Sequence, residues 1–259
     1  GGKPNKIMPD GTYLSARLGG VRVYAGYLDH WWGPGQFTAL QLSNNARPMP
    51  QIGLSRSGTQ ASSWPILRWL GPWQLEFFLG TFDGPQIHSN VFYNAAHLTI
   101  NPLPGLEIGF AKTEQFCGKG HPCSPLRDYF INIDLANHPD NVNGEGSLEI
   151  KYSNAIGRLP FQAYMQMMNE DYSWTSRSGS SHLLGASVFL STRTNPVKLT
   201  VEYANSIATK TLFSFGTHVY GFSYANGQYP DGMRYRGRTL GFSLDNDSTL
   251  LSLQGSWSD

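Results

Sequence analysis

The sequence predicts an all-β fold, and more specifically a transmembrane, antiparallel, up-and-down β-barrel. Three observations support this prediction. Apolar and polar side chains alternate with a period of two over many stretches. Aromatic residues make up 13% of the chain and charged residues only 14%. The connections between the predicted strands alternate between short and long, as in bacterial outer-membrane barrels.

The composition excludes several other classes. The chain has 259 residues, a net charge of +1, 29 Gly and 16 Pro. A helical bundle needs more Ala, Glu, Lys and Leu, and a disordered chain has fewer aromatic residues. The small net charge argues against a nucleic-acid partner. No run of about 18 apolar residues predicts a membrane-spanning helix.

Strands are expected from the first third of the chain onward. The early segments are weaker candidates, and they cover 13–27, 36–43, 51–57 and 64–70. The first clear strand is 73–82, in which Trp73, Leu75, Phe77 and Leu79 alternate with mainly polar or small residues. Strands follow at 91–100 and 105–113. One face of each strand is therefore apolar and the other is polar.

The middle of the chain continues the pattern. Strands are expected at 146–155, 160–169, 182–192 and 196–206. In the last of these, Val197, Leu199, Val201 and Tyr203 alternate strictly with polar residues. The polar faces contain mostly Gln, Ser, Thr, Gly and Asn. This composition fits a hydrated barrel lumen better than the charged outer face of a soluble lipocalin or β-sandwich, which is the alternative.

The last two expected strands are 235–244 and 249–257. Leu240, Phe242 and Leu244 would face lipid, and Arg236 and Arg238 would lie on the same face near a long loop. Both arginines are therefore candidates for lipopolysaccharide contact, although they also fit two solvated arginines beside a loop. Since a short turn at 245–247 precedes strand 249–257, we expect this strand to run outward and end on the extracellular side. That direction would leave at least one further strand to be added.

All the short connections fall at one end of the predicted sheet, because consecutive connections of a meander lie at opposite ends. They are 101–104, 155–158, 192–196 and 245–247. The long connections are 82–90, 113–146, 170–181 and 206–234. Tight periplasmic turns and long extracellular loops have this distribution.

Cys117 and Cys123 are the only cysteines. Because Gly118, Gly120 and Pro122 allow the chain between them to turn back, we expect a disulfide in an oxidising compartment. Two free thiols are the alternative. A zinc site with His121 would have only three clustered ligands, and we expect no metal and no cofactor.

The densest motif is Asp29-His30-Trp31-Trp32-Gly33-Pro34-Gly35, followed by Ser43-Asn44-Asn45-Ala46-Arg47-Pro48-Met49-Pro50. Indole rings stack on sugars, and Asn, Asp and Arg can bind sugar hydroxyls. An aromatic girdle with an inward loop that plugs the lumen explains the same residues. The chemistry favours this second interpretation.

These blocks resemble the Wzi family of outer-membrane capsule-assembly proteins. Similar blocks follow in the same order, namely Leu67-Arg68-Trp69-Leu70-Gly71-Pro72, Leu106-Glu107-Ile108-Gly109, Gly118-Lys119-Gly120, Glu170-Asp171, Glu202-Tyr203 and Tyr235 to Gly241. The resemblance extends from about Tyr13 to the end. It implies a monomeric barrel of eighteen strands in the outer membrane that acts as a lectin for capsular polysaccharide. About twelve strands are expected in these 259 residues, so one barrel domain lacking N-terminal strands and a C-terminal end is predicted.

We therefore expect a non-enzymatic protein that binds capsular polysaccharide or exopolysaccharide and contacts outer-membrane lipid. The sugar-binding candidates on the long loops are Asp171, Tyr172, Trp174, Tyr229 and Asp231, and packing within the loops is the alternative role for them. A porin-like channel is the second functional hypothesis. A glycan hydrolase or lyase is the third, because Glu170 and Asp171 could converge in a loop as a carboxylate pair.

Overall fold

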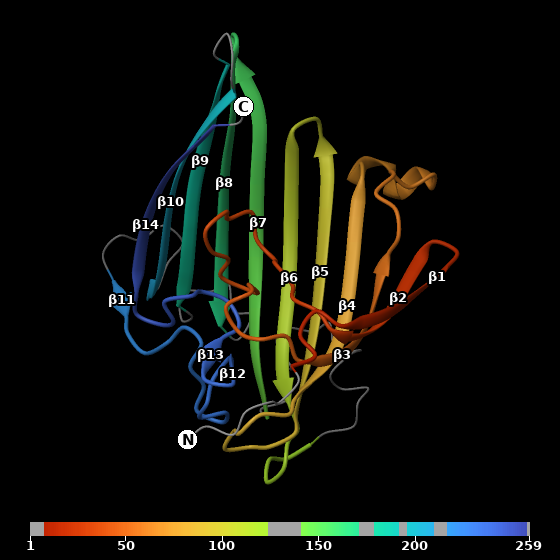
Figure 1. The fold of residues 1–259 in the computed structure, drawn as a ribbon, viewed down its shortest axis with the longest axis vertical. Helices are drawn as coiled ribbons and strands as arrows, with labels where there is room; N and C mark the ends of the chain where they lie inside the picture. Colours follow the sequence, from red (N-terminus) through yellow and green to blue (C-terminus); the bar gives the residue numbers. More distant parts are fainter. Residues whose placement is uncertain (1–7, 124–140, 171–178, 192–195, 210–216, 258–259) are drawn as a thin grey trace.

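The structure is a computed structural model that describes residues 8–123, 141–170, 179–191, 196–209 and 217–257. One antiparallel sheet of twelve strands dominates it (Figure 1). Its strands are β1 (Tyr13–Leu18), β2 (Val21–Tyr27), β3 (Pro50–Arg56), β4 (Trp73–Phe82), β5 (Val91–Leu103), β6 (Leu106–Phe116), β7 (Val142–Ile156), β8 (Leu159–Glu170), β9 (Ser180–Ser191), β10 (Pro196–Thr209), β11 (His218–Val219) and β14 (Thr249–Trp257). The predicted all-β fold with about twelve strands is confirmed.

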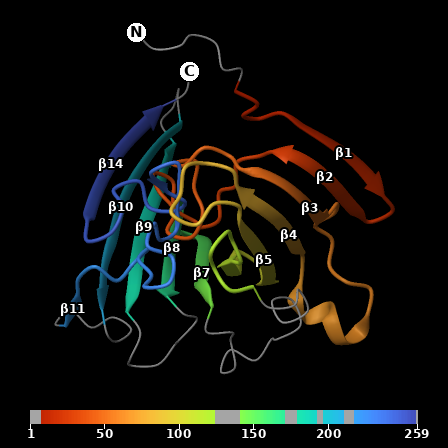
Figure 2. The same cartoon turned by 90° about the horizontal axis from the view of Figure 1, so that it is seen from below.

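The strands follow the order of the sequence, and β14 pairs with β10. The sheet curves into a deep arc whose two edges are β1 and β14 (Figure 2). Among the described residues β1 pairs only with β2 and β14 only with β10, so the arc is not closed into a ring. In the part of the chain that the structure describes, no helix is both long and apolar enough to cross a membrane.

The two faces of the sheet differ as the alternation predicts. On β10, Leu199, Val201 and Tyr203 are 40–45% exposed, whereas Thr200 and Glu202 are buried at 4% and 2%. The strongly exposed side chains are thus aliphatic or aromatic, and the buried ones are polar. This inverted arrangement is typical of a strand with lipid on its convex face and packed, polar contacts on its concave face.

The connections also fall as expected. The turns β1–β2, β5–β6 and β7–β8 lie at one end of the sheet, which we call the short-turn end. The other end, the long-loop end, carries the connections after β2, β4, β6, β8 and β10 (Figure 1). Two connections break the rule. The connection 57–72 is long but lies at the short-turn end, and the turn at 245–247, expected among the short connections, leads into β14 at the long-loop end.

The expected direction of the last strand is wrong. Val197, at the start of β10, pairs with Trp257, and Asn205 pairs with Thr249. Strand β14 therefore starts at the long-loop end and finishes at the short-turn end. The reason is that no strand covers 235–244, so β14 follows a long loop and not a tight turn.

Four other predicted segments differ from the structure. Residues 13–27 form two strands joined at Gly19 and Gly20 and not one. Residues 36–43 are irregular, and Pro65–Leu70 is the 3₁₀ helix η1. In 235–244 only β12 (Arg234–Tyr235) and β13 (Arg238–Thr239) form a small hairpin. Leu240 and Phe242, which we expected to face lipid, are instead 3% and 0% exposed in the core.

Two loop regions fill the concave side of the sheet (Figure 2). The first inner segment is residues 28–49, and the second is residues 220–248. Their buried rings form one core with the sheet, to which Trp32, Phe78, Tyr93, Tyr224 and Phe242 contribute. The hydrophobic core is thus on the inside of the arc, between the strands and these two segments.

Polar side chains on the sheet fix the first inner segment. Glu202 on β10 accepts hydrogen bonds from the backbone N–H groups of Gln36 (2.6 Å) and Thr38 (3.1 Å). Gln166 on β8 accepts from the Leu40 N–H at 2.8 Å and donates to the Trp32 carbonyl at 3.0 Å. These bonds satisfy buried backbone groups that have no strand partner.

Candidate functional site

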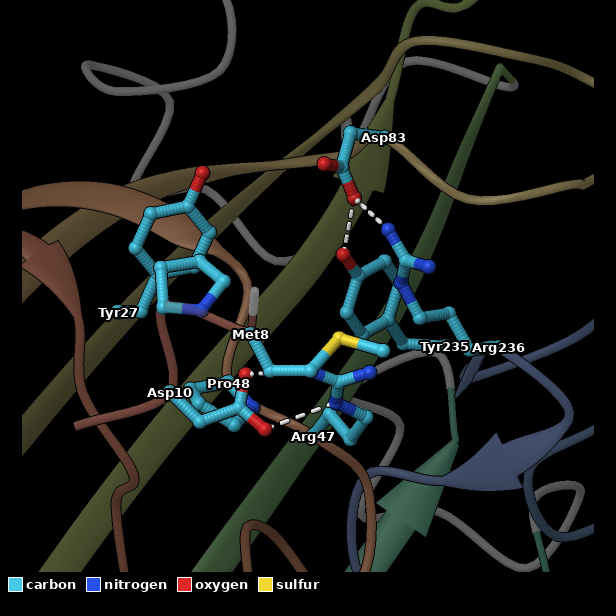
Figure 3. A pocket seen from close by; sticks show the side chains of 9 residues that line it. Met8, Asp10, Tyr27, Arg47, Pro48, Asp83, Tyr235 and Arg236 are labelled. Carbon is cyan, nitrogen blue, oxygen red and sulfur yellow. Dashed lines mark hydrogen bonds and ion pairs between the residues drawn. The ribbon is translucent and has the colours of Figure 1, made fainter. Parts of the chain in front are cut away.

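A pocket of about 240 Å³ opens at the long-loop end. Figure 3 shows it from close by. Its lining residues are Met8, Pro9, Asp10, Tyr27, Arg47, Pro48, Asp83, Tyr235 and Arg236. They come from five separate stretches of the chain, which meet only in the folded molecule. We call this cavity the outer pocket.

One side of the outer pocket is the ion pair between Arg47 and Asp10. The guanidinium donates from Nε and from one terminal nitrogen to the two carboxylate oxygens, at 2.8 and 2.7 Å. Asp10 is placed by the turn before β1, where the Gly11 N–H bonds the Tyr27 carbonyl at 2.9 Å. This bidentate geometry fixes both side chains, although about a third of each remains exposed.

The other side is formed by Asp83, which follows β4, and the β12–β13 hairpin. Arg236 donates to Asp83 Oδ1 at 2.8 Å, and the Tyr235 hydroxyl donates to the same oxygen. The hairpin turns at Arg236 and Gly237, whose φ angles of 53° and 78° are typical of a type I′ turn. This turn directs Arg236 back across the ring of Tyr235 toward Asp83 (Figure 3).

The charges of the outer pocket are fixed around neutral pH. The hydrogen bond from Arg47 holds the pKa of Asp10 below its usual range. Burial, together with the Asp83 carboxylate, raises the pKa of Tyr235 to about 12. The bonds to Tyr235 and Asp83 raise the pKa of Arg236. Two carboxylates, two guanidinium groups and a neutral phenol therefore face one cavity.

This set of groups suits hydrogen bonding to a polyol. The carboxylate oxygens accept bonds from hydroxyl groups, the guanidinium groups donate, and the Tyr27 ring offers a flat apolar surface. The pKa of Asp10 is lowered, whereas a general acid needs a raised one. The geometry favours holding a sugar over cleaving one.

The tryptophan motif contributes to the inner core and not to the outer pocket. Trp32 is buried between His97 and Phe78, with ring centroids 5.0 and 5.6 Å away. A Cβ on Gly33 would lie 2.6 Å from Gln166 Oε1, and one on Gly35 would lie 2.0 Å from the Thr38 carbonyl oxygen. Glycine at these two positions allows the backbone of the segment to lie close to the sheet at Gly33 and close to its own next turn at Gly35. Pro34 lies between the two glycines.

The second motif joins the two inner segments. Asn45 donates from Nδ2 to the Thr239 carbonyl and hydroxyl oxygens, both at 3.0 Å. Asn44 is exposed, and Arg47 and Pro48 continue into the outer pocket. The motif thus links the core of the inner segments to the polar cavity above it.

Of the five predicted sugar-binding residues, the structure describes only Tyr229 and Asp231. Asp171, Tyr172 and Trp174 fall outside the described residues. Tyr229 is only 2% exposed, its hydroxyl donates to the Cys117 carbonyl at 2.9 Å, and its ring stacks on His121 at 4.3 Å. Because both faces are enclosed, Tyr229 is not available to stack on a sugar. Asp231 accepts the Ile87 N–H at 2.7 Å, and its role in sugar binding stays a prediction.

Cys117 and Cys123 are joined in a disulfide that closes a short loop after β6. Both sulfur atoms are therefore unavailable to the zinc alternative. Among the described residues no group of three or more His, Cys, Asp or Glu side chains is placed to hold a metal ion. The disulfide loop packs on Tyr229 through His121.

The two arginines considered for lipopolysaccharide contact separate in the structure. Arg236 points into the outer pocket, whereas Arg238 is exposed on the other side of the turn. The expected common face with Leu240 and Phe242 is wrong, because the segment is a hairpin followed by a buried loop.

Four polar or aromatic residues of the outer pocket were not predicted from the sequence, namely Asp10, Tyr27, Asp83 and Tyr235. They lie far from their partners in sequence; Arg236 and Asp83 are 153 residues apart. The sequence could have indicated only that Tyr27 and Asp83 lie where strands β2 and β4 end, and therefore at the long-loop end of the sheet.

Comparisons with known proteins agree with the fold. Residues 5–257 match the family described as capsule assembly protein Wzi. A solved structure of Wzi, described as an outer membrane protein involved in group 1 capsule assembly in Escherichia coli and as a carbohydrate binding β-barrel, has a TM-score of 0.81 and 23% identity, over 96% of this chain and 53% of that one. Neither the family nor this structure is described as an enzyme.

A third match is the uncharacterized 55.8 kDa protein in the cps region of Klebsiella pneumoniae. It is 26% identical over 191 residues, which are 72% of this chain and 36% of that protein. The chain therefore spans about a third of one relative and about half of the other. The family match, in contrast, covers almost every residue, and the chain belongs to the Wzi family of capsule assembly proteins.

Proposed function

We propose that this protein binds capsular polysaccharide or exopolysaccharide at the bacterial outer membrane and helps to hold it on the cell surface. The observation that carries the proposal is the outer pocket, with its two Arg–Asp pairs and Tyr27 around a cavity of about 240 Å³. Family membership and the carbohydrate-binding relative support the same function.

The proposed location follows from the two faces of the sheet. The aliphatic convex face contacts lipid, and the long-loop end faces outward, so the outer pocket is open to the cell surface. Arg238, exposed at this end, is proposed to contact lipopolysaccharide. We propose that the protein acts as a monomer.

The test uses purified capsular polysaccharide and the detergent-solubilised protein in surface plasmon resonance. We expect Arg236→Ala to weaken binding about tenfold or more, because it removes a charge-assisted donor from the pocket. Arg238→Ala is the matched control, since Arg238 lies in the same hairpin but does not line the pocket. Equal affinities of the two variants and the wild-type protein would reject the outer pocket as the binding site.

A porin-like channel is the second candidate, and the wide concave face of the sheet favours it. The inner segments occupy that face, however, and the polar lumen is filled by their backbone and side chains. We therefore propose that they plug the lumen. Steady open-pore current through the wild-type protein in planar bilayers would favour the channel instead.

We further propose that the protein has no enzymatic activity. Glu170 belongs to the carboxylate pair considered for hydrolysis. It is 3% exposed and accepts a hydrogen bond from the Tyr224 N–H at 2.5 Å, so it holds the second inner segment in place. Asp10 and Asp83 each bind an arginine. Release of new reducing ends from capsular polysaccharide would contradict this proposal.

A further inference from the structure

A second cavity, of about 530 Å³, lies on the concave face toward the short-turn end. Its lining includes Arg17, Arg22, Trp31, Gln74 and Thr99, and it has no residue in common with the outer pocket. Trp31 comes from the first inner segment and the other four residues come from β1, β2, β4 and β5. We call it the inner cavity.

The register of the sheet brings its polar groups into one row. Arg17 on β1 pairs with Arg22 on β2, Arg22 with Ser55 on β3, and Ser55 with Glu76 on β4. Directly paired residues of an antiparallel sheet point to the same face. The two arginines therefore lie side by side on the inside of the arc, near the short turns.

Of the other charged groups in the lining, Glu76 and Arg56 are already committed to the protein, and Asp29 is a further carboxylate at the edge of the first inner segment. Glu76 accepts the Tyr24 hydroxyl at 2.9 Å and lies 3.6 Å from His30. Arg56 donates to the backbone carbonyls of Trp73 (2.7 Å) and Gln60 (2.9 Å). Neither group needs a ligand to be satisfied.

Arg17 and Arg22 differ from these groups. Arg17 makes no hydrogen bond or ion pair with any residue that the structure describes, and it is exposed. Arg22 has one hydrogen bond, from Nε to Ser55 Oγ at 3.1 Å, and its nearest carboxylate, that of Glu76, is 4.0 Å away. Two like charges in directly opposed positions destabilise a sheet, and an anion between them removes that cost.

Trp31 supplies the apolar part of the inner cavity. Its Nε1–H donates to the Gly35 carbonyl at 2.9 Å, which fixes the indole, and the residue is still 38% exposed. An immobilised indole with an open face is a stacking surface for the apolar face of a sugar ring. An inorganic anion has no apolar face that could stack on this indole. An acidic sugar can stack its ring on the indole and bind the arginines through its carboxylate.

We propose that the inner cavity is a second saccharide site that binds a uronic-acid unit of a glycan. The sugar carboxylate accepts bonds from Arg17 and Arg22, the sugar ring stacks on Trp31, and Gln74 and Thr99 face its hydroxyl groups. The site lies at the end opposite the outer pocket, which under the proposed orientation is the periplasmic end. This inference is independent of the outer pocket, because the two sites do not share a residue.

The experiment measures binding to the detergent-solubilised protein by isothermal titration calorimetry. The probes are tetraglucuronate and its carboxyl-reduced counterpart, cellotetraose. We expect Arg17→Gln to weaken tetraglucuronate binding about tenfold and to leave cellotetraose binding unchanged. Trp31→Ala should weaken the binding of both. Arg17→Gln removes no hydrogen bond or ion pair to any residue that the structure describes, so we expect the variant to fold like the wild-type protein. Heat-modifiable gel mobility checks this.

Two controls distinguish the inner cavity from the outer pocket and from a site for simple anions. Arg47→Ala changes the outer pocket and should leave the Arg17-dependent binding of tetraglucuronate intact. This result is expected whether or not the outer pocket binds glycans. Inorganic phosphate should displace tetraglucuronate poorly. Unchanged tetraglucuronate affinity in Arg17→Gln, or equal displacement by phosphate and glucuronate, would overturn the proposal.

Discussion

At the scale of single residues, buried carboxylates on the sheet hold irregular backbone in place. Glu202 is the clearest case, because it is 2% exposed and accepts four hydrogen bonds. Three come from the backbone N–H groups of Gln36, Phe37 and Thr38, and the fourth comes from the Tyr164 hydroxyl at 2.8 Å. A negative charge that faces four donors costs less to bury than an unpaired one and orients the first inner segment.

Glu202→Gln tests this role. The amide presents an N–H₂ group where an oxygen now accepts donors, so at least one buried N–H loses its partner. We expect the free energy of unfolding to fall by about 3 kcal/mol, measured by urea titration in lipid vesicles. Glu107→Gln is the control, because Glu107 is 35% exposed in its pair with Lys151 and should change stability by less than about 1 kcal/mol. Equal losses in both variants would contradict the proposed role of Glu202.

Single residues also show how much of the outer pocket can be predicted from the sequence. Arg47 and Arg236 were recognised as charged residues in unusual contexts, one in a Pro-rich motif and one near a loop. Their partners Asp10 and Asp83 are 37 and 153 residues away. No local pattern encodes such a pairing, because it depends on where two loops meet after the sheet has formed.

At the scale of elements, two sets of three adjacent strands have the same arrangement. Tyr24 on β2 lies over Gly53 on β3 and donates to Glu76 on β4 at 2.9 Å. Tyr164 on β8 lies over Gly185 on β9 and donates to Glu202 on β10. The glycine leaves room for the ring, which covers the bare backbone, and the hydroxyl satisfies the carboxylate.

Gly185→Ala is expected to disrupt this arrangement. The new Cβ would lie 2.2 Å from Tyr164 Cζ, so the ring must move and its bond to Glu202 is lost. We expect a loss of about 1–3 kcal/mol in the free energy of unfolding. Gly255→Ala on β14 is the matched control, because its Cβ would meet only Leu199 Cδ2 at an ordinary 3.4 Å. If Gly255→Ala lowered the free energy of unfolding as much as Gly185→Ala, the cause would be the loss of a glycine from a strand and not the clash with the Tyr164 ring.

Alternation identified β4 to β10 and β14 because each of these strands has one lipid-like face and one polar face. It failed in 235–244, where Leu240 and Phe242 also alternate. Both of these side chains are buried, and their period of two comes from packing in a loop and not from a strand. It failed again at 64–70, where Pro65 begins the 3₁₀ helix η1 with no buried residue. Period two alone therefore does not distinguish a strand from an irregular segment whose alternate side chains are buried.

Helix η1 and its N-cap residue Trp64 present three large apolar side chains, Trp64, Ile66 and Trp69, which are 63–71% exposed. It projects on the convex side of the sheet at the short-turn end (Figure 2). Exposed tryptophan near one end of a membrane-spanning sheet is typical of the interface between lipid headgroups and water. In vesicles whose lipids carry bromine near the headgroup, we expect Trp64→Phe with Trp69→Phe to lower the quenchable tryptophan fluorescence. A quenched fraction equal to that of the wild-type protein would place η1 outside the bilayer.

At the scale of the whole molecule, the two inner segments depend on each other. Ser43 donates to the Gly241 carbonyl at 2.5 Å, Tyr224 donates to the Leu40 carbonyl at 2.6 Å, and Asn45 binds Thr239. Each of these bonds joins loops from opposite halves of the chain. The concave face is therefore filled by one interlocked body, so the strength of the plug depends on contacts between the segments as well as on their contacts with the sheet.

This interlock predicts what opens the lumen. Ser43→Ala with Asn45→Ala removes the side-chain bonds that the first inner segment donates to the second. The Tyr224 bond to Leu40 and the bonds from the sheet, such as those of Glu202, stay in place. We expect the wild-type protein, extracted from its native membrane, to be silent in planar bilayers and the double variant to show intermittent current. Asn44→Ala is the control, because Asn44 is an exposed neighbour in the same motif and does not line the outer pocket. Silence in the double variant would mean that the bonds from Ser43 and Asn45 are not needed to hold the plug. Current in Asn44→Ala would mean that any change in the motif loosens it.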